Sequence, residues 1–356
     1  MDDGDEVALG EVGVLGAGLI GGSVARRLVS VGASVHVHDP DPDALAGAAG
    51  FGAVTASERE VLERCDLVVL GVAPTVGADL WCERIVGGGL PPPPSGRRRL
   101  VVDVSSVKAP VLERLAGVGV PTRTRAEQLL LTHPMAGREV SGWNAGDAEL
   151  FDGAAWIVCP PTTATGRELA RTLAFVRAVG AQAAFLSPET HDRFAAAVSH
   201  LPHVLAFAMA SLLDEHDPDR VMRSFAGGSL RDLLRVADAS PRLWTEILAG
   251  NREQVAGLVT AIIERVRDTA ARGPSVALRD VPDAERAARS GHMPSPDGAA
   301  VAAPVERSLP LDVELGETAV ADLVATGEAG LQVGAFDLDG SEGLLRLRLT
   351  RREPGP

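Results

Sequence analysis

A glycine-rich turn near the start of the chain constrains the fold more than any other feature. Residues 7–18 form a short apolar run that ends in glycines, and residues 19–33 continue with apolar side chains at helical spacing. The following SVHVHD alternates like a strand and ends in Asp39. Strand, glycine turn, helix and strand, in this order, predict the first unit of a parallel, doubly wound α/β sheet.

The turn has the spacing GxGxxG, which is typical of dinucleotide binding when a strand precedes it and a helix follows. Gly16 permits the tight turn, Gly18 lets the backbone approach a pyrophosphate, and Gly21 lets helix and strand pack closely. The helix N-terminus, at Leu19 and Ile20, then faces the phosphates. The alternative, a tight turn that holds no cofactor, fits this full context less well.

Asp39, at the end of the second strand, indicates which cofactor the turn holds. A carboxylate at this place accepts hydrogen bonds from the hydroxyl groups of the adenosine ribose. The next three residues are Pro, Asp and Pro, so a phosphate on the ribose would meet no basic side chain and would be repelled. The sequence therefore predicts NAD rather than NADP.

Composition and charge limit the class of protein. The 356 residues are enough for two domains, and the net charge of -14 disfavours a nucleic-acid partner. Cys65, Cys82 and Cys159 have no metal-ligand spacing, so no metal site is expected. No apolar run approaches the roughly 20 residues that span a bilayer, and the acidic N-terminus differs from a signal peptide. We expect a cytoplasmic protein with no membrane partner.

The character of the sequence changes along the chain and predicts four parts. Residues 1–187 alternate apolar runs with helical segments and form the nucleotide-binding domain. Residues 188–272 are mostly helical, and their strongly apolar helix at 193–213 needs a partner surface, which suggests a homodimer. Residues 273–308 have the composition of a linker, and residues 309–352 predict strand, helix, strand and strand, the start of a small α+β module.

Two segments near the expected sheet edge carry candidate catalytic residues. DVSSVK, residues 103–108, ends a strand, where Ser106 could contact a ligand or the segment could be a Ser cap with a solvated Lys. LTHPMAGREVSG, residues 131–142, is too broken by Pro and Gly for a good helix or strand. Its His133 has the chemistry of a general base, although taken alone it is more simply a loop residue, and Glu139 is more simply a solvated carboxylate.

Two further segments lie in the helical half. Ser199, His200 and His203 share one helix face. The two histidines have no evident third metal ligand, so substrate contact or core hydrogen bonding is expected. Asp232 and Arg235 are one turn apart, which is usually a surface ion pair, but in a pocket Arg235 would bind a carboxylate.

Taken in order, the glycine turn, DVSSVK, HPMAGRE, SHLPH and GGSLRDLLR…SPRLW resemble the prephenate dehydrogenase family, including its arogenate-using relatives. The resemblance runs from about Val12 to Arg252. It implies a Rossmann-type domain followed by a helical dimerisation domain, with NAD as cofactor and a homodimer as the assembly. The reaction it implies is oxidative decarboxylation of prephenate to 4-hydroxyphenylpyruvate, a step of tyrosine biosynthesis.

The resemblance also assigns roles to individual residues. The family's catalytic histidine falls on His133, its partner serine on Ser106, and its carboxylate-binding arginine on Arg235. The remaining positions implied to line the substrate pocket are Ser199, His200, His203, Glu139, Gly228, Asp232 and Trp244. The sequence departs from the family where GGSL replaces GGGF at residues 227–230 and where Leu234 replaces Thr, and both changes bear on substrate preference.

In the implied reaction, His133 accepts the proton of the ring alcohol while a hydride leaves the same carbon for the nicotinamide, and Ser106 holds the hydroxyl. Three alternatives remain. Arogenate carries an ammonium in place of the keto group, and would make Glu139 more important. A non-catalytic NAD-binding sensor would have no need of His133 beside a carboxylate clamp. A dehydrogenase of ordinary hydroxy acids would not explain SHLPH together with the Arg–Asp segment.

The C-terminal residues resemble a degraded ACT domain, a small βαββαβ regulatory module, of which only the first elements are recognisable. The turn after its first strand, residues 315–318, reads LGET and lacks the usual Asp and Pro. We therefore predict weak or absent amino-acid binding by this tail.

Overall fold

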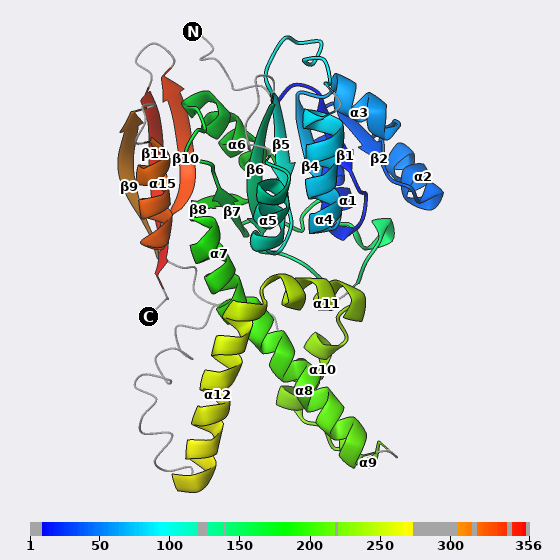
Figure 1. The fold of residues 1–356 in the computed structure, drawn as a ribbon, viewed down its shortest axis with the longest axis vertical. Helices are drawn as coiled ribbons and strands as arrows, with labels where there is room; N and C mark the ends of the chain where they lie inside the picture. Colours follow the sequence, from blue (N-terminus) through cyan, green and yellow to red (C-terminus); the bar gives the residue numbers. More distant parts are fainter. Residues whose placement is uncertain are drawn as a thin grey trace.

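The structure is a computed structural model, and it describes residues 9–87, 89–119, 127–138, 140–217, 220–272, 305–314, 319–339 and 344–353. Glu139 and the tail turn at residues 315–318 lie outside these described residues, as does most of the linker predicted at residues 273–308. The described residues form one large sheet with helices on both faces, and a helical part extends from one end of it (Figure 1).

A single sheet runs through the nucleotide-binding part and the tail, in the order β3-β2-β1-β4-β5-β6-β7-β8-β10-β11-β9. Its strands are β1 (Val12–Leu15), β2 (Val35–His38), β3 (Val54–Thr55), β4 (Leu67–Leu70), β5 (Arg99–Asp103), β6 (Glu127–Pro134), β7 (Ala155–Cys159), β8 (Gln182–Phe185), β9 (Val305–Glu314), β10 (Gln332–Asp339) and β11 (Leu344–Glu353). The strands from β3 to β6 are parallel, which confirms the predicted α/β sheet, and β7 is antiparallel to β6. Because β1 lies between β2 and β4, the strand order reverses there, and ligands bind at the carboxyl ends of strands at such a point.

Helices cover both faces of this sheet because its inner strands are apolar on both sides. In β4, Leu67 and Val69 pack on one face, while Val68 and Leu70 pack on the other. The helices on the first face are α1 (Leu19–Ser30), α2 (Pro42–Phe51) and α6 (Gly166–Ala178). Those on the second face are α3 (Glu58–Arg64), α4 (Pro74–Asp79), η1 (Leu80–Val86) and α5 (Ala109–Gly117).

The helical part begins where the sequence predicts it. Ser187 accepts a hydrogen bond from the backbone N–H of Thr190, and Pro188 is the first helical residue. The helices that follow are α7 (Pro188–Ala195), η3 (Ala196–His200), α8 (Leu201–His216), α9 (Val221–Ser224), α10 (Gly228–Ala237), α11 (Pro241–Gly250) and α12 (Arg252–Arg272). The first three form one continuous helix, and η3 is a π-helical turn just before Pro202, which has no backbone N–H for the α-helical ladder.

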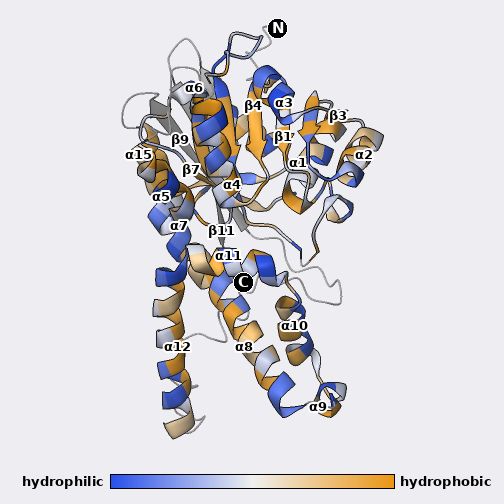
Figure 2. Cartoon of the chain, turned by 45° about the vertical axis from the view of Figure 1, so that its right-hand side comes forward, coloured by the Kyte–Doolittle hydropathy of each residue, from blue (hydrophilic) through white to orange (hydrophobic). Residues whose placement is uncertain are grey.

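This continuous helix, residues 188–216, is long enough and apolar enough, by length and composition alone, to cross a membrane. The expectation that no segment is long and apolar enough to span a bilayer was wrong. Polar residues interrupt the apolar run, but they are too few to bring the average hydropathy of this helix below that of a spanning segment. Only 17% of its most apolar 18-residue segment is buried within the chain. Apolar side chains of α8, among them Leu205, Met209 and Leu212, are exposed. Figure 2 shows hydrophobic residues along the ribbon of α8. The helix therefore presents an apolar surface of the kind that binds a partner.

The C-terminal tail contains the predicted strand, helix, strand and strand, and it extends the main sheet. Strand β10 pairs antiparallel with β8 through Val333 and Ala183, and β11 and β9 follow. Helix α15 (Ala319–Glu328) packs on β8 so closely that a Cβ on Gly327 would lie 1.7 Å from the carbonyl oxygen of Phe185. The described tail is thus continuous with the sheet of the nucleotide-binding part (Figure 1).

Candidate active site

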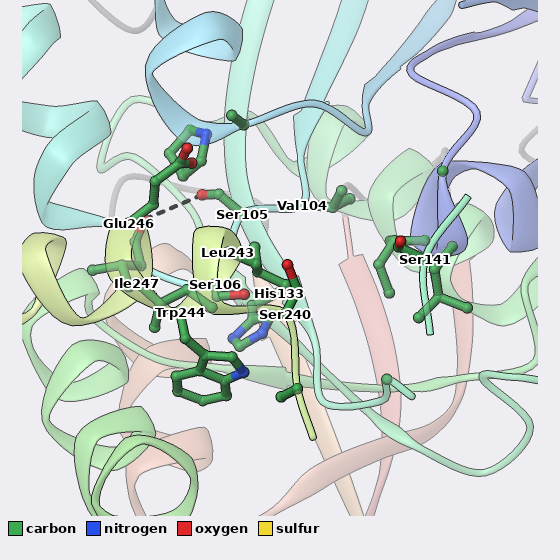
Figure 3. A pocket seen from close by; sticks show the side chains of 18 of the residues that line it. Val104, Ser105, Ser106, His133, Ser141, Ser240, Leu243, Trp244, Glu246 and Ile247 are labelled. Atoms are coloured by element: carbon green, nitrogen blue, oxygen red, sulfur yellow. Dashed lines mark hydrogen bonds between the residues drawn. The ribbon is translucent and has the colours of Figure 1, made fainter. Parts of the chain in front are cut away.

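A cavity of about 740 Å³ lies at the carboxyl ends of the parallel strands, where the nucleotide-binding part meets the helices. The first part contributes the turn after β1 and the segments that follow β4, β5 and β6, and the second contributes η3, α8 and α11. In Figure 3, the side chains of Ser106 and His133 lie close together, beside Ser240 and Trp244. Both parts of the chain therefore build the site.

The glycine turn leaves room at this cavity for a phosphate group. Gly16 has a φ of +91°, and a Cβ there would lie 2.5 Å from the carbonyl oxygen of Gly71. A Cβ on Gly21 would lie 1.9 Å from the carbonyl oxygen of Gly16. Gly18, by contrast, lines the cavity, and a Cβ on it would meet no atom within 4 Å. Gly18 thus keeps space open at the N-terminus of α1, which has no side-chain cap, and the turn fits a pyrophosphate.

Asp39 directly follows β2 and lies beside the glycine turn. Its Oδ2 atom accepts a hydrogen bond of 2.6 Å from the backbone N–H of Ala17, and its Oδ1 atom accepts one of 2.8 Å from that of Asp41. The carboxylate therefore fixes the middle of the turn. A carboxylate at this place also fits the ribose of a dinucleotide.

His133 lies in strand β6, opposite Ile157 of β7, so the expectation that its segment is neither helix nor strand was wrong at this residue. The residue before a proline favours the extended backbone, and the antiparallel pairing with β7 continues the strand to Pro134. Burial lowers the pKa of His133 well below its ordinary value, and the nearby His191 and Lys108 lower it further. Its imidazole is therefore neutral near pH 7, the form that accepts a proton.

Lys108 is the only lysine in the chain, and it is fully buried beneath the cavity. Its Nζ atom donates hydrogen bonds of 2.9 Å to Asp103 Oδ2, 2.7 Å to the carbonyl oxygen of Ser105 and 2.6 Å to that of Thr132. The alternative of a Ser cap with a solvated lysine was therefore wrong. These bonds fix the DVSSVK segment at the end of β5, where Ser106 lines the cavity.

The helical part contributes Ser199, His200, His203 and Trp244 to the cavity lining. The rings of His203 and Trp244 stack with centroids 3.6 Å apart, and His203 Nδ1 donates a hydrogen bond of 2.9 Å to the carbonyl oxygen of Ser199. Nδ1 of His200 accepts a hydrogen bond of 3.1 Å from Asn251, and burial lowers the pKa of His200 to about 4. Among the residues that the structure describes, no three potential metal ligands come together.

Comparison with known proteins identifies the family. Residues 24–185 match the nucleotide-binding domain of prephenate dehydrogenase, and residues 187–271 match its dimerization domain. The cyclohexadienyl dehydrogenase of Zymomonas mobilis is 30% identical over 248 residues, which are 67% of this chain and 80% of that protein. The chain belongs to the prephenate dehydrogenase family. The predicted order of a nucleotide-binding domain and a helical dimerisation domain is thereby confirmed.

Other relatives agree with this family. The probable prephenate dehydrogenase NovF of Streptomyces niveus is 31% identical over 252 residues, or 68% of this chain, and the chain spans 63% of the length of that relative. A putative prephenate dehydrogenase of Corynebacterium glutamicum has a TM-score of 0.62 at 27% identity and covers 73% of this chain and 80% of its own. Prephenate dehydrogenase from A. aeolicus, in complex with hydroxyphenyl propionate and NAD+, shows the same fold, with a TM-score of 0.67 at 24% identity over 79% of this chain and 98% of its own.

Three residues predicted for the substrate pocket of this family member do not line the cavity. Gly228, Asp232 and Arg235 lie on α10, which is beside α8 and farther from the sheet than α11 (Figure 1). We assigned them to the pocket because their motif resembles that of the family. The order of motifs along a chain does not show how far apart the residues lie in the fold. Their contact with substrate stays a prediction, as does that of Glu139, which lies outside the described residues.

The cavity also contains two arginines that the sequence reasoning missed. Arg138 lines the cavity and forms an ion pair with Asp147. Arg242 of α11 lines it too, with its Nε atom 4.0 Å from the Glu246 carboxylate. Both arginines lie within motifs that carry the family resemblance, HPMAGRE and SPRLW. Their position in these motifs is the sequence feature from which a place in the cavity could have been predicted. Each is a second candidate, beside Arg235, for holding a carboxylate.

Proposed function

We propose that the chain is an NAD-dependent dehydrogenase that converts prephenate to 4-hydroxyphenylpyruvate by oxidative decarboxylation, in tyrosine biosynthesis. One observation carries the proposal. One cavity is lined by Ser106 and His133, by Gly18 of the glycine turn, and by Ser199 and His203 of the helical part. A hydroxyl group, a neutral base and a dinucleotide cradle at one cavity suit the removal of a hydride and a proton from an alcohol.

Bound NAD would supply the hydride acceptor. Gly18 and the N-terminus of α1 would hold its pyrophosphate, and Asp39 would accept hydrogen bonds from its adenosine ribose. Ser106 would hold the ring hydroxyl of prephenate, and His133 would take the hydroxyl proton. Carbon dioxide leaves as the ring becomes aromatic, so the chain has to orient the substrate and accept one proton.

Orientation of prephenate requires partners for its two carboxylates. We propose Arg235 for one of them on the basis of its motif, and Arg138 and Arg242 are the arginines that line the cavity. The remaining side chains proposed to contact the substrate are those of Ser199, His200, His203, Glu139, Asp232 and Trp244, together with the backbone at Gly228.

We also propose that the chain works as a homodimer in the cytoplasm. The helix with the exposed apolar side chains of Leu205, Met209 and Leu212 lies within the part that matches the dimerization domain. A second copy packed against this face would bury these side chains through the same patch on both subunits. The proposal therefore accounts for the apolar helix without a membrane.

The absorbance of reduced cofactor tests this function, with purified protein given prephenate or arogenate together with NAD or NADP. We expect NADH from prephenate and NAD. Faster turnover of arogenate would keep the role of His133 and change the substrate. Tight NAD binding without turnover of either compound would contradict the proposal and favour a sensor.

A further inference from the structure

A buried row of hydrogen bonds leads from His133 away from the cavity. The Nδ1 atom of His133 lies 2.9 Å from Nε2 of His191, and Nδ1 of His191 lies 2.7 Å from Oδ1 of Asp192. The Asp192 carboxylate also accepts hydrogen bonds of 2.9 Å from the backbone N–H groups of Lys108 and Ala109. His191 is fully buried and Asp192 is 5% exposed, so the row is shielded from solvent.

When both histidines are neutral, only one assignment of their ring protons gives every hydrogen bond in this row a donor and an acceptor. An ionised carboxylate can only accept, so Nδ1 of His191 carries the proton that is donated to Asp192. Nε2 of a neutral His191 is then an acceptor, and Nδ1 of His133 has to be the donor. His133 therefore keeps its lone pair on Nε2, the nitrogen on the other side of the ring from His191.

We propose that His191 and Asp192 are positioning residues that hold His133 in the tautomer with its proton on Nδ1. The catalytic consequence rests on the proposed function, because Nε2 of His133 would be the atom that takes the substrate proton. Without the pair, His133 could carry its proton on either nitrogen, and the form with Nε2–H cannot act as the base. When His133 becomes positively charged, His191 still accepts its Nδ1–H, so the imidazolium keeps a partner.

The surroundings favour the charge states that this order requires. Burial lowers the pKa of His191 more than its hydrogen bond to Asp192 raises it. Burial lowers the pKa of His133 as well, assisted by His191, Lys108 and His200. Burial alone would raise the pKa of Asp192, but hydrogen bonds from His191 and from two backbone N–H groups outweigh it and lower that pKa. Two neutral histidines and one carboxylate anion therefore occupy the row near neutral pH.

Asp192→Asn tests the proposal directly because it reverses the row. The new amide would donate to Nδ1 of His191, whose proton would move to Nε2 and be donated to Nδ1 of His133, leaving the His133 proton on Nε2. Nitrogen NMR of protein with 15N-labelled histidine shows which ring nitrogen carries the proton, without substrate or cofactor. The His133 signal is assigned by its loss in His133→Gln. We expect Nδ1–H in the wild type and Nε2–H in Asp192→Asn, and Nε2–H in the wild type would overturn the proposal.

Kinetics then measure the consequence. Asp192→Asn should lower kcat by about 10²–10⁴-fold and leave KM for prephenate within about threefold, as expected when a catalytic histidine is held in the wrong tautomer. His191→Phe keeps a buried aromatic ring but removes the nitrogen that accepts the His133 proton, so its kcat should fall by a similar factor. This variant replaces Asp192→Asn as the test if Asp192→Asn does not fold. Glu189→Gln, which removes an exposed carboxylate from the same helix, is the matched control with unchanged kcat.

Two outcomes separate this proposal from the proposed function. Wild-type kcat in folded Asp192→Asn or His191→Phe would overturn the positioning role. A wild type that shows Nδ1–H at His133 but turns over neither prephenate nor arogenate would contradict the proposed function and leave the tautomer assignment supported.

Discussion

Lys108→Met removes the only ammonium group beneath the candidate active site. Lys108 and Asp103 form an ion pair of 2.9 Å in which the side chains are 0% and 3% exposed. Removal of one partner from a buried pair costs about 3–5 kcal/mol, because the other charge stays behind in a medium of low dielectric constant. The carbonyl oxygens of Ser105 and Thr132 lose their donor as well. We therefore expect the free energy of unfolding of the nucleotide-binding part to fall by about 3–5 kcal/mol.

Thermal unfolding, followed by circular dichroism, measures this loss. A change of 1 kcal/mol shifts the Tm of a 150–250-residue domain by roughly 2–4 °C, so the Tm of Lys108→Met should fall by roughly 6–20 °C. The double variant Lys108→Met/Asp103→Leu removes both charges and should recover about 2 kcal/mol or more. Lys108→Arg keeps the charge but overpacks a fully buried site, and should still cost about 1–3 kcal/mol. A Tm change below roughly 3 °C in Lys108→Met, or no recovery in the double variant, would refute this reasoning.

Three further predictions concern the cofactor cradle, a buried histidine and the proposed substrate arginine. Gly18→Val fills the open cradle, so NAD titration should show no binding while Tm stays within about 2 °C of the wild type, since nothing lies within 4 Å of the new Cβ. The pKa of about 4 for His200 lies below the value of about 6.5 in the unfolded chain, so the unfolded chain binds the proton first as pH falls. Its contribution to stability should be complete above about pH 6.5 and fall by about 3 kcal/mol toward pH 4, and urea unfolding of His200→Gln should show a correspondingly weaker pH dependence. Arg235→Ala should raise KM for prephenate by about 10–100-fold with little change in kcat, and an unchanged KM in initial-rate measurements would exclude Arg235 as the carboxylate partner.

Features that depend on neighbouring residues could be predicted from the sequence. The glycine turn, the apolar strands and the start of α7 at Ser187 and Pro188 follow from local spacing and capping, and the structure has each of them. The same holds for His203 and Ser199, because residues four apart on a helix share a face.

Features set by contacts between distant residues could not be predicted in this way. Lys108 has the pattern of a solvated lysine, but the fold brings Thr132 and Asp192 to it from 24 and 84 positions away. His191 and Asp192 resemble ordinary polar residues of a first helical turn, and only the fold brings them to His133. The antiparallel pairing of the tail with β8 is equally absent from the pattern of either strand, since edge strands are open to many partners.

The most direct test of the central claim, that His133 is the base of an NAD-dependent dehydrogenase, compares NADH formation from prephenate by the wild type and by His133→Asn, with NAD binding measured on both. We predict equal NAD binding and a kcat that is about 10²–10⁴-fold lower in the variant. Equal rates in the two proteins, or no NADH from a wild type that binds NAD, would contradict the claim.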